Sequence, residues 1–183
     1  MEPDIDTKPT GATLTKAQAI ELNKALSGRR AQVRYLTHFD TDRIWRRGKG
    51  EDSTIDKPRI AEDDRPAFSK DSRTGEMKPK QIDVITYAEN DTLHVLGKSG
   101  GISVFDGRNP NLPGSKKRPW YCLFVSKTTK VPDGLLLAKN VKLDAETGFF
   151  HYAFQPAYDM TLAEFKKNLQ QLDKYIKVIG WQT

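Results

Sequence analysis

The stretch GKSGGISVFDG, residues 97–107, combines the residue types that proteins use to bind phosphate groups. Four glycines, one lysine and two serines surround a short apolar segment. A Walker-type loop places lysine and serine or threonine after its second glycine, at the start of a helix. Here Lys98 precedes the glycine pair, and strand-forming residues follow Ser103. The dinucleotide fingerprint of parallel sheets does not fit either. The stretch therefore predicts a tight turn, or a backbone approach to a ligand, that leads Ser103 into a strand.

A second candidate for chemistry is His151, which lies in the aromatic stretch FFHYAFQP. If this stretch is a strand, His151 and Ala153 share one face. A lone histidine on a strand is more often a hydrogen-bonded core residue than a catalyst. The chain has only three histidines, so no three-histidine metal site is indicated and we expect no bound metal. Cys122, the single cysteine, lies in an apolar stretch where thiols are usually inert.

The length and charge of the chain indicate one basic domain. A chain of 183 residues can bury one core without disulfides. We expect a mobile tail at residues 1–12 and a single domain over residues 13–183. Within it, residues 40–80 are rich in charge and proline, which predicts a loop-rich excursion with at most a short helix, anchored by Ile44 and Trp45. The net charge of +6 favours polyanionic partners, although a soluble protein with surplus lysine on its surface would carry the same charge without such a partner.

The pattern of elements predicts an α+β fold. A helix begins at the capping box formed by Thr15 and Gln18 and ends at Gly28. A closing helix begins at the capping box formed by Thr161 and Glu164. The apolar face of the closing helix is expected to continue to Ile176. Between the two helices, short runs of alternating residues separated by turn signals indicate antiparallel strands. These runs lie at residues 31–39, 82–87, 92–97, 101–106, 120–126, 134–144 and 149–157.

No part of the sequence predicts a secretory signal or a membrane span. The first residues, MEPDIDTKPTG, lack a basic segment followed by an apolar one. The longest apolar runs are far shorter than a transmembrane helix. We therefore expect export, if it occurs, without a cleavable signal peptide, and no membrane insertion.

Three segments together resemble a known toxin family. GGISVFD at residues 100–106, VPDGLLLAKNVKLD at 131–144 and HYAFQPAYDM at 151–160 occur in the order and approximate spacing of the second type VI secretion exported effector toxins of Pseudomonas. The resemblance covers about residues 82–176. It implies an ADP-ribosyltransferase-like fold, a pair of antiparallel sheets flanked here by N-terminal and C-terminal helices, with a cleft that accommodates NAD.

The resemblance also implies a set of site residues. Gly100 and Gly101 would let the backbone pass close to NAD, and Ser103 would orient the nicotinamide ribose. An early strand of these transferases usually supplies an arginine or histidine to NAD. Arg34 is our choice for that position, and His38 is the alternative.

The chemistry of the family directs attention to His151 as the second catalytic residue beside Ser103. Cleavage of the nicotinamide–ribose bond passes through an oxocarbenium-like state, which electron-rich groups stabilise. Most transferases of this fold use a glutamate, but the matching strand offers His151 and Gln155 instead. A neutral imidazole can orient the ribose or accept a proton. Asp106 and Glu146 are possible substitutes for the missing carboxylate.

These observations predict an intracellularly acting toxin, a type VI secretion effector that works in the cytoplasm of a target cell. It would bind NAD as a substrate and transfer ADP-ribose to an unidentified acceptor, or hydrolyse NAD. An immunity protein with an acidic surface would neutralise it. The alternative is a non-enzymatic module that binds nucleic acid or protein through GSKKRPW and RIWRRGKG. A toxin with chemistry that does not use NAD is a third interpretation.

Overall fold

The computed structural model describes residues 14–60, 68–70, 73–79 and 82–180. The tail expected at residues 1–12 lies outside these residues. The regular elements are α1 (Lys16–Ser27), β1 (Val33–Leu36), β2 (Arg43–Arg47), β3 (Phe68–Lys70), β4 (Met77–Pro79), β5 (Thr86–Glu89), β6 (Thr92–Val95), β7 (Ile102–Phe105), β8 (Trp120–Phe124), β9 (Leu135–Asn140), β10 (His151–Pro156), β11 (Met160–Thr161), α2 (Leu162–Gln170), the short 3₁₀ helix η2 (Asp173–Tyr175) and β12 (Ile176–Gly180).

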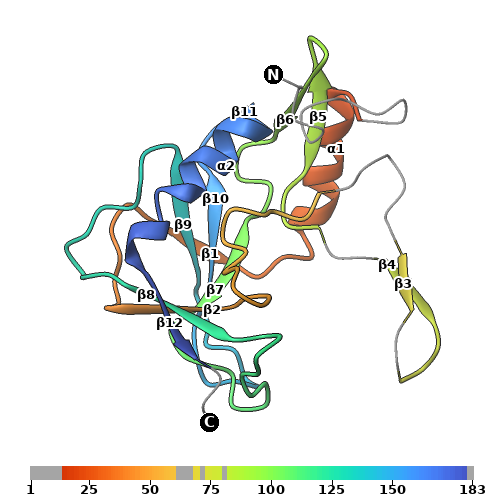
Figure 1. Ribbon diagram of the computed structural model, residues 1–183. Helices are drawn as coiled ribbons and strands as arrows, with labels where there is room; N and C mark the ends of the chain where they lie inside the picture. Colours follow the sequence, from red (N-terminus) through yellow and green to blue (C-terminus); the bar gives the residue numbers. More distant parts are fainter. Residues whose placement is uncertain (1–13, 61–67, 71–72, 80–81, 181–183) are drawn as a thin grey trace.

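The described strands form two antiparallel sheets and a separate hairpin. The larger sheet has seven strands in the order β1-β9-β10-β7-β2-β8-β12, the smaller has the order β11-β6-β5, and β3 pairs with β4. Strands β2 and β7 share one registered pair, Trp45 with Phe105. Figure 1 shows β2 running across the direction of β7 and β10, so the larger sheet bends sharply at this junction. The α+β class with a pair of antiparallel sheets is confirmed.

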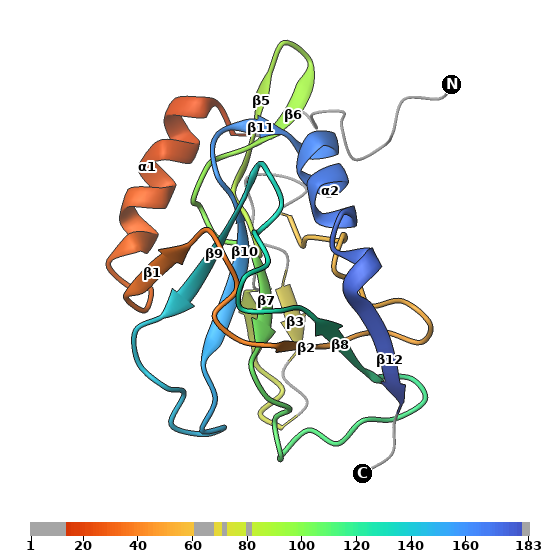
Figure 2. The same ribbon diagram turned by 90° about the vertical axis from the view of Figure 1, so that its left-hand side faces the viewer.

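Two helices flank the strands, and both begin as expected. Figure 2 shows α1 and α2 on opposite sides of β9 and β10. Reciprocal capping boxes start them, with Thr15 and Gln18 at α1 and Thr161 and Glu164 at α2. In such a box each side chain accepts the other residue's backbone N–H, which satisfies donors that a helix start leaves unpaired. The apolar face of α2 is buried in the main core through Leu162, Phe165 and Leu169.

The closing helix is shorter than the sequence suggests. It ends at Gln170, and residues Ile176–Gly180 form β12, which pairs with β8. The apolar spacing continues past the helix because Leu172 and Ile176 both pack against the same core. Buried apolar residues therefore continue at helical spacing into a segment that is a strand, and this spacing predicts a longer helix than the protein has.

The charged stretch at residues 40–80 contributes a central strand, which the sequence-based expectation missed. Strand β2 pairs with β8 over its full length, from Arg43 to Arg47. Ile44 is fully buried and Trp45 is 9% exposed. The alternation of RIWRR was hidden by its arginines, because charged residues are rarely buried without a partner. Arg46 has such partners, described below.

Candidate functional site

A cleft of about 950 Å³ opens between α1 and the larger sheet. Its walls come from the C-terminal end of α1, from β1 and from the loop around Ser99, and its floor from one face of β7, β9 and β10. This volume is at the upper end of the range typical of small-molecule and cofactor sites. Strand register arranges the floor, since Ser103 lies opposite Ala153, and His151 lies opposite Phe105.

His151 and Ser103 form a hydrogen-bonded pair in this cleft. The Nε2 atom of His151 lies 3.0 Å from the Ser103 Oγ atom, and its Nδ1 atom lies 3.5 Å from Asn140 Oδ1. An amide oxygen only accepts, so this orientation of Asn140 assigns the proton to Nδ1. The Ser103 hydroxyl then donates to Nε2. The ring of Phe105 meets the imidazole edge-on at 5.2 Å and limits its rotation.

The imidazole of His151 is held neutral. Burial lowers its pKa below the usual histidine value, and the nearby Asp144 carboxylate opposes this effect to a smaller extent. Burial disfavours the charged form of any base, because the charge loses its hydration. At pH 7 the ring can therefore accept a proton through Nε2.

Arg46 fixes the strand that carries Ser103. Its Nη1 atom donates to the Ser103 carbonyl oxygen at 2.8 Å. Its other groups donate to the carbonyl oxygens of Ser53 and Thr54 and to the Thr54 hydroxyl. Burial lowers its pKa to about 10, so the guanidinium stays charged at neutral pH. The sequence predicts a loop-rich excursion here and offers RIWRRGKG as a binding segment of the alternative module, whereas the structure makes Arg46 an internal support of the site.

The glycine pair lies at the cleft and also packs against the protein's own backbone. Gly100 has a φ of +129°, and a Cβ atom there would lie 2.2 Å from the carbonyl oxygen of Asp83. A Cβ on Gly101 would lie 2.1 Å from the carbonyl oxygen of Phe154. Both glycines line the cleft. Close backbone packing is therefore sufficient to require glycine at both positions, independently of any ligand.

The charged side chains that line the described cleft are mostly basic. Asp83 is the single carboxylate among them, and it is buried and paired with Arg59, whose Nη2 donates at 2.7 Å. An anionic ligand fits such a wall, because guanidinium and ammonium groups donate strong hydrogen bonds to phosphate oxygens. The cations are Arg29, Arg30, Arg59 and Lys98.

Arg30 is held in a defined position by protein partners. Its Nη1 donates to Asn23 Oδ1 at 2.7 Å and its Nη2 donates to the Ser99 carbonyl oxygen at 2.8 Å. These bonds tie the end of α1 to the glycine loop. Arginine carries five N–H groups, so others remain for a ligand. Sequence reasoning missed Arg30, Arg59 and Asn140, because no local motif marks residues that meet only in the fold.

The structure does not bring Arg34 into the cleft. On β1, Val33 and Tyr35 line the cleft, and Arg34 between them is exposed and not part of the lining. Successive side chains of a strand point to opposite faces, which directs Arg34 away. The alternative, His38, is exposed, forms an isolated bridge with Lys130 and does not line the cleft either. Neither residue enters the proposed site.

The two carboxylates considered as substitutes for a catalytic glutamate also lie elsewhere. Asp106 accepts the backbone N–H of Phe150 at 2.8 Å and lines a separate pocket. Glu146 is exposed in a turn closed by Asp144. Among the residues described, the cleft thus has no unpaired carboxylate, and the hydrogen-bonded Ser103 hydroxyl and His151 imidazole are its candidate groups for chemistry.

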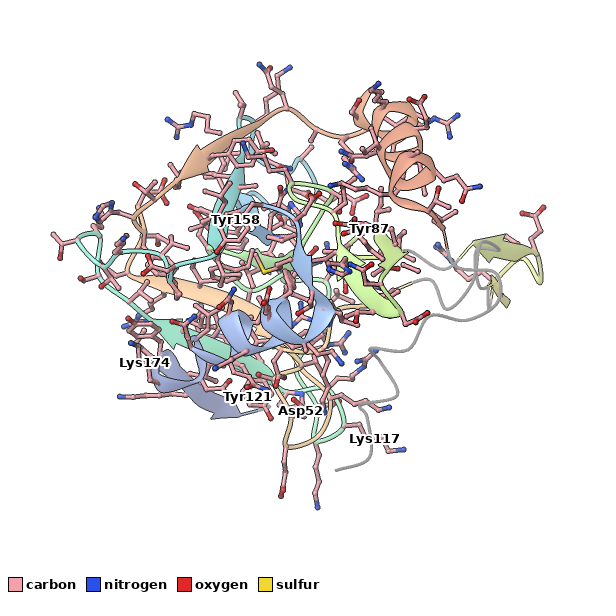
Figure 3. All side chains as sticks on the ribbon, turned by 90° about the horizontal axis from the view of Figure 1, so that it is seen from above. Asp52, Tyr87, Lys117, Tyr121, Tyr158 and Lys174 are labelled. Atoms are coloured by element: carbon pink, nitrogen blue, oxygen red, sulfur yellow. The ribbon has the colours of Figure 1, made fainter. Side chains whose placement is uncertain are left out.

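The tryptophans of the two basic segments are not available for stacking on a base. Trp45 and Trp120, the tryptophans of RIWRRGKG and GSKKRPW, are 9% and 3% exposed, so neither can stack on a base. Figure 3 shows Lys117 on the side of the molecule remote from α1. The basic loop at residues 115–118 is therefore separate from the cleft.

Two further features are absent from the described part of the chain. None of its helices has the length and apolar character that crossing a membrane requires. It also holds no group of three or more histidine, cysteine, aspartate or glutamate residues arranged to bind a metal ion.

Comparison with known families identifies a matching family model. A family model described as Tse2 ADP-ribosyltransferase toxin matches residues 56–178, more than half of the chain. The matched range contains both Ser103 and His151. Comparison with curated proteins gives no match.

Proposed function

Because this chain belongs to the Tse2 ADP-ribosyltransferase toxin family, we propose that its cleft binds NAD and that it acts as a toxin by consuming NAD there. The observation that supports this proposal is the Ser103–His151 pair, hydrogen-bonded at 3.0 Å on the floor of a basic cleft of suitable size. Basic walls suit the pyrophosphate of a dinucleotide, and the polar floor suits its ribose.

In the proposed reaction, the bond between nicotinamide and ribose breaks and nicotinamide leaves as a neutral molecule. A nucleophilic group of an acceptor, or water, then forms a bond to the same ribose carbon and loses its proton. His151 takes up that proton through Nε2, because its imidazole is neutral and placed beside the Ser103 hydroxyl. Asn140 keeps the other nitrogen protonated. The absence of a free carboxylate from the described cleft leaves Ser103 and His151 to orient the ribose.

The biological setting forms part of the same proposal. We place the toxin's action in the cytoplasm of a target cell after type VI secretion, with an immunity protein that covers the cleft. The cleft's cations, Arg29, Arg30, Arg59 and Lys98, favour an acidic surface on that partner through charge complementarity.

Expression in bacteria tests the function directly. The wild type, Ser103→Ala and Ser115→Ala are induced in a bacterial cytosol, and growth and NAD content are followed together. We expect the wild type and Ser115→Ala to arrest growth and lower NAD, and Ser103→Ala to do neither at equal expression. Ser115 is the matched control because it is exposed in the basic loop and does not line the cleft.

Two results would contradict this expectation. Arrest with steady NAD that still depends on Ser103 would point to selective modification or to a different chemistry, and it would exclude bulk consumption. Normal growth and NAD with well-expressed wild type would contradict the toxin function in bacteria.

The basic wall gives a second prediction. Arg30→Gln is expected to raise the KM for NAD about 10- to 100-fold, since a charge-assisted hydrogen bond contributes about 1.5–3 kcal/mol. The kcat should change less, because phosphate contacts form in the ground state and the transition state alike. Steady-state assays of nicotinamide release measure both constants. Arg118→Gln, in the exposed basic loop, is the control. An unchanged KM for Arg30→Gln would show that Arg30 does not bind NAD.

A further inference from the structure

Gln155 on β10 is a buried side chain of the cleft with an unsatisfied amide. It lines the cleft and is 8% exposed. Its Oε1 atom is fully enclosed and has no hydrogen-bond partner within the described residues. Buried polar atoms nearly always have partners, and leaving one unpaired destabilises the folded state. Folding alone therefore gives no reason for an amide at this position.

The neighbouring buried polar groups of the cleft do have partners. Asp83 binds Arg59, and the Ser99 hydroxyl accepts a backbone N–H at 3.0 Å. One other enclosed side-chain atom without a partner is found in the described residues, Arg47 Nε. Arg47 does not line the cleft, and its Nη2 donates to the Pro113 carbonyl oxygen. Gln155 is thus the exception within the site.

Small residues line the floor of the cleft near Gln155. Gly101 lies against the backbone at Gln155, and Ala138 and Ala153 also line the cleft. Strand alternation puts Gln155 on the same face as Ala153 and His151. Gln155 lies four positions after His151 on β10, which corresponds to roughly 13 Å along the strand. A ligand whose reactive bond lies at His151 can therefore contact Gln155 only through a group that is far from that bond.

We propose that Gln155 recognises an uncharged ring system with a neighbouring hydrogen-bond donor and acceptor. In NAD the group that is uncharged and lies far from the reactive bond is the amino and ring-nitrogen edge of adenine, so the inference rests on the proposed function. A primary amide presents an acceptor beside a donor, and glutamine pairs with the adenine edge in this way in protein–DNA complexes. Gln155 is then a specificity-determining residue, whereas the cations of the cleft bind the phosphates.

Binding measurements on the purified full chain test this role. The probe is a carbocyclic NAD analogue whose nicotinamide bond cannot break, and titration calorimetry gives its Kd. Gln155→Leu, which keeps the approximate volume and removes the amide, is expected to weaken binding at least 10-fold. Its thermal midpoint should equal or exceed that of the wild type, because an unpaired buried amide is replaced by an apolar group. Gln171→Leu, exposed at the end of α2, should change neither quantity.

Two fragments of the dinucleotide separate the possible sources of the contact. A loss of affinity for ADP-ribose with unchanged affinity for nicotinamide mononucleotide would assign the contact to adenine, and a loss for nicotinamide mononucleotide would contradict that assignment. Equal affinities of wild type and Gln155→Leu for all three ligands would overturn the inference. So would a lower thermal midpoint without loss of affinity, which indicates a structural role. Failure of the wild type itself to bind any of them would overturn the proposed function, and the role of Gln155 with it.

Discussion

His151→Ala is expected to lower kcat/KM for nicotinamide release by about 10²- to 10⁴-fold, the usual contribution of a positioned acid–base group. The substitution removes the acceptor that lies 3.0 Å from the Ser103 hydroxyl. It leaves the basic wall intact, so affinity for the uncleavable NAD analogue should fall much less than the rate. His38→Ala is the matched control, because His38 is exposed and lies outside the cleft.

The pH profile of the wild type provides an independent measure of the same group. Burial lowers the pKa of His151, so the neutral form persists to lower pH than for an ordinary histidine of pKa 6.5. The rate should therefore fall on the acid side with a midpoint below 6.5. Folding stability should decline as pH falls from 6.5 toward the folded-state pKa, because the unfolded chain takes up the proton first. An acid midpoint that is unchanged in His151→Ala would exclude His151 as the titrating group.

Gly101→Ala is expected to destabilise the fold by about 3 kcal/mol or more, the upper part of the range for overpacking. The added Cβ would lie 2.1 Å from the Phe154 carbonyl oxygen and 2.9 Å from the Gln155 nitrogen. These are backbone atoms of β10, so the clash is relieved only if β7 and β10 move apart at the floor of the cleft. For a chain of this size the thermal midpoint should drop by roughly 6–12 °C.

The matched control for this substitution is Gly28→Ala. Gly28 ends α1 with a φ of −67°, and no atom lies within 4 Å of an added Cβ. Differential scanning calorimetry should place its midpoint at or slightly above that of the wild type, because alanine restricts the unfolded chain. A Gly101→Ala protein that melts with the wild type would show that the loop can move aside, and the packing argument would fail.

Most of the elements that the sequence predicts correctly are marked by local sequence patterns. The capping boxes at Thr15 and Thr161 and the strand alternation around Ser103 act over a few residues, and the structure confirms those elements. Strand β2 was missed because its arginines resemble a solvated stretch, and only the fold reveals that Arg46 has internal acceptors. Segment β12 was missed because burial beside β8 continues the apolar spacing of α2.

The site depends on pairings that are distant in the chain. Local sequence drew attention to Ser103 and His151, and the resemblance gave them roles, but their hydrogen bond depends on the antiparallel register of β7 and β10. The basic wall depends on contacts such as Arg30 with Ser99, 69 residues apart. Arg34 illustrates the opposite case. A basic residue on an early strand matched the expectation by type, yet its strand position turns it away from the cleft.

In the proposed function, the charge of the cleft also shapes how the protein competes for NAD inside a cell. Apart from the paired Asp83, the charged groups that line the described cleft are cations, and these attract any nucleotide or polyphosphate. Cytoplasm contains many such anions, so electrostatic attraction alone would bring other nucleotides into the cleft as readily as NAD. Discrimination then has to come from the uncharged floor, where a serine hydroxyl, an imidazole and a buried amide meet the parts of a ligand that differ between nucleotides. Under the proposed function, selectivity and recruitment thus reside in separate surfaces of one cleft and can be changed independently of each other.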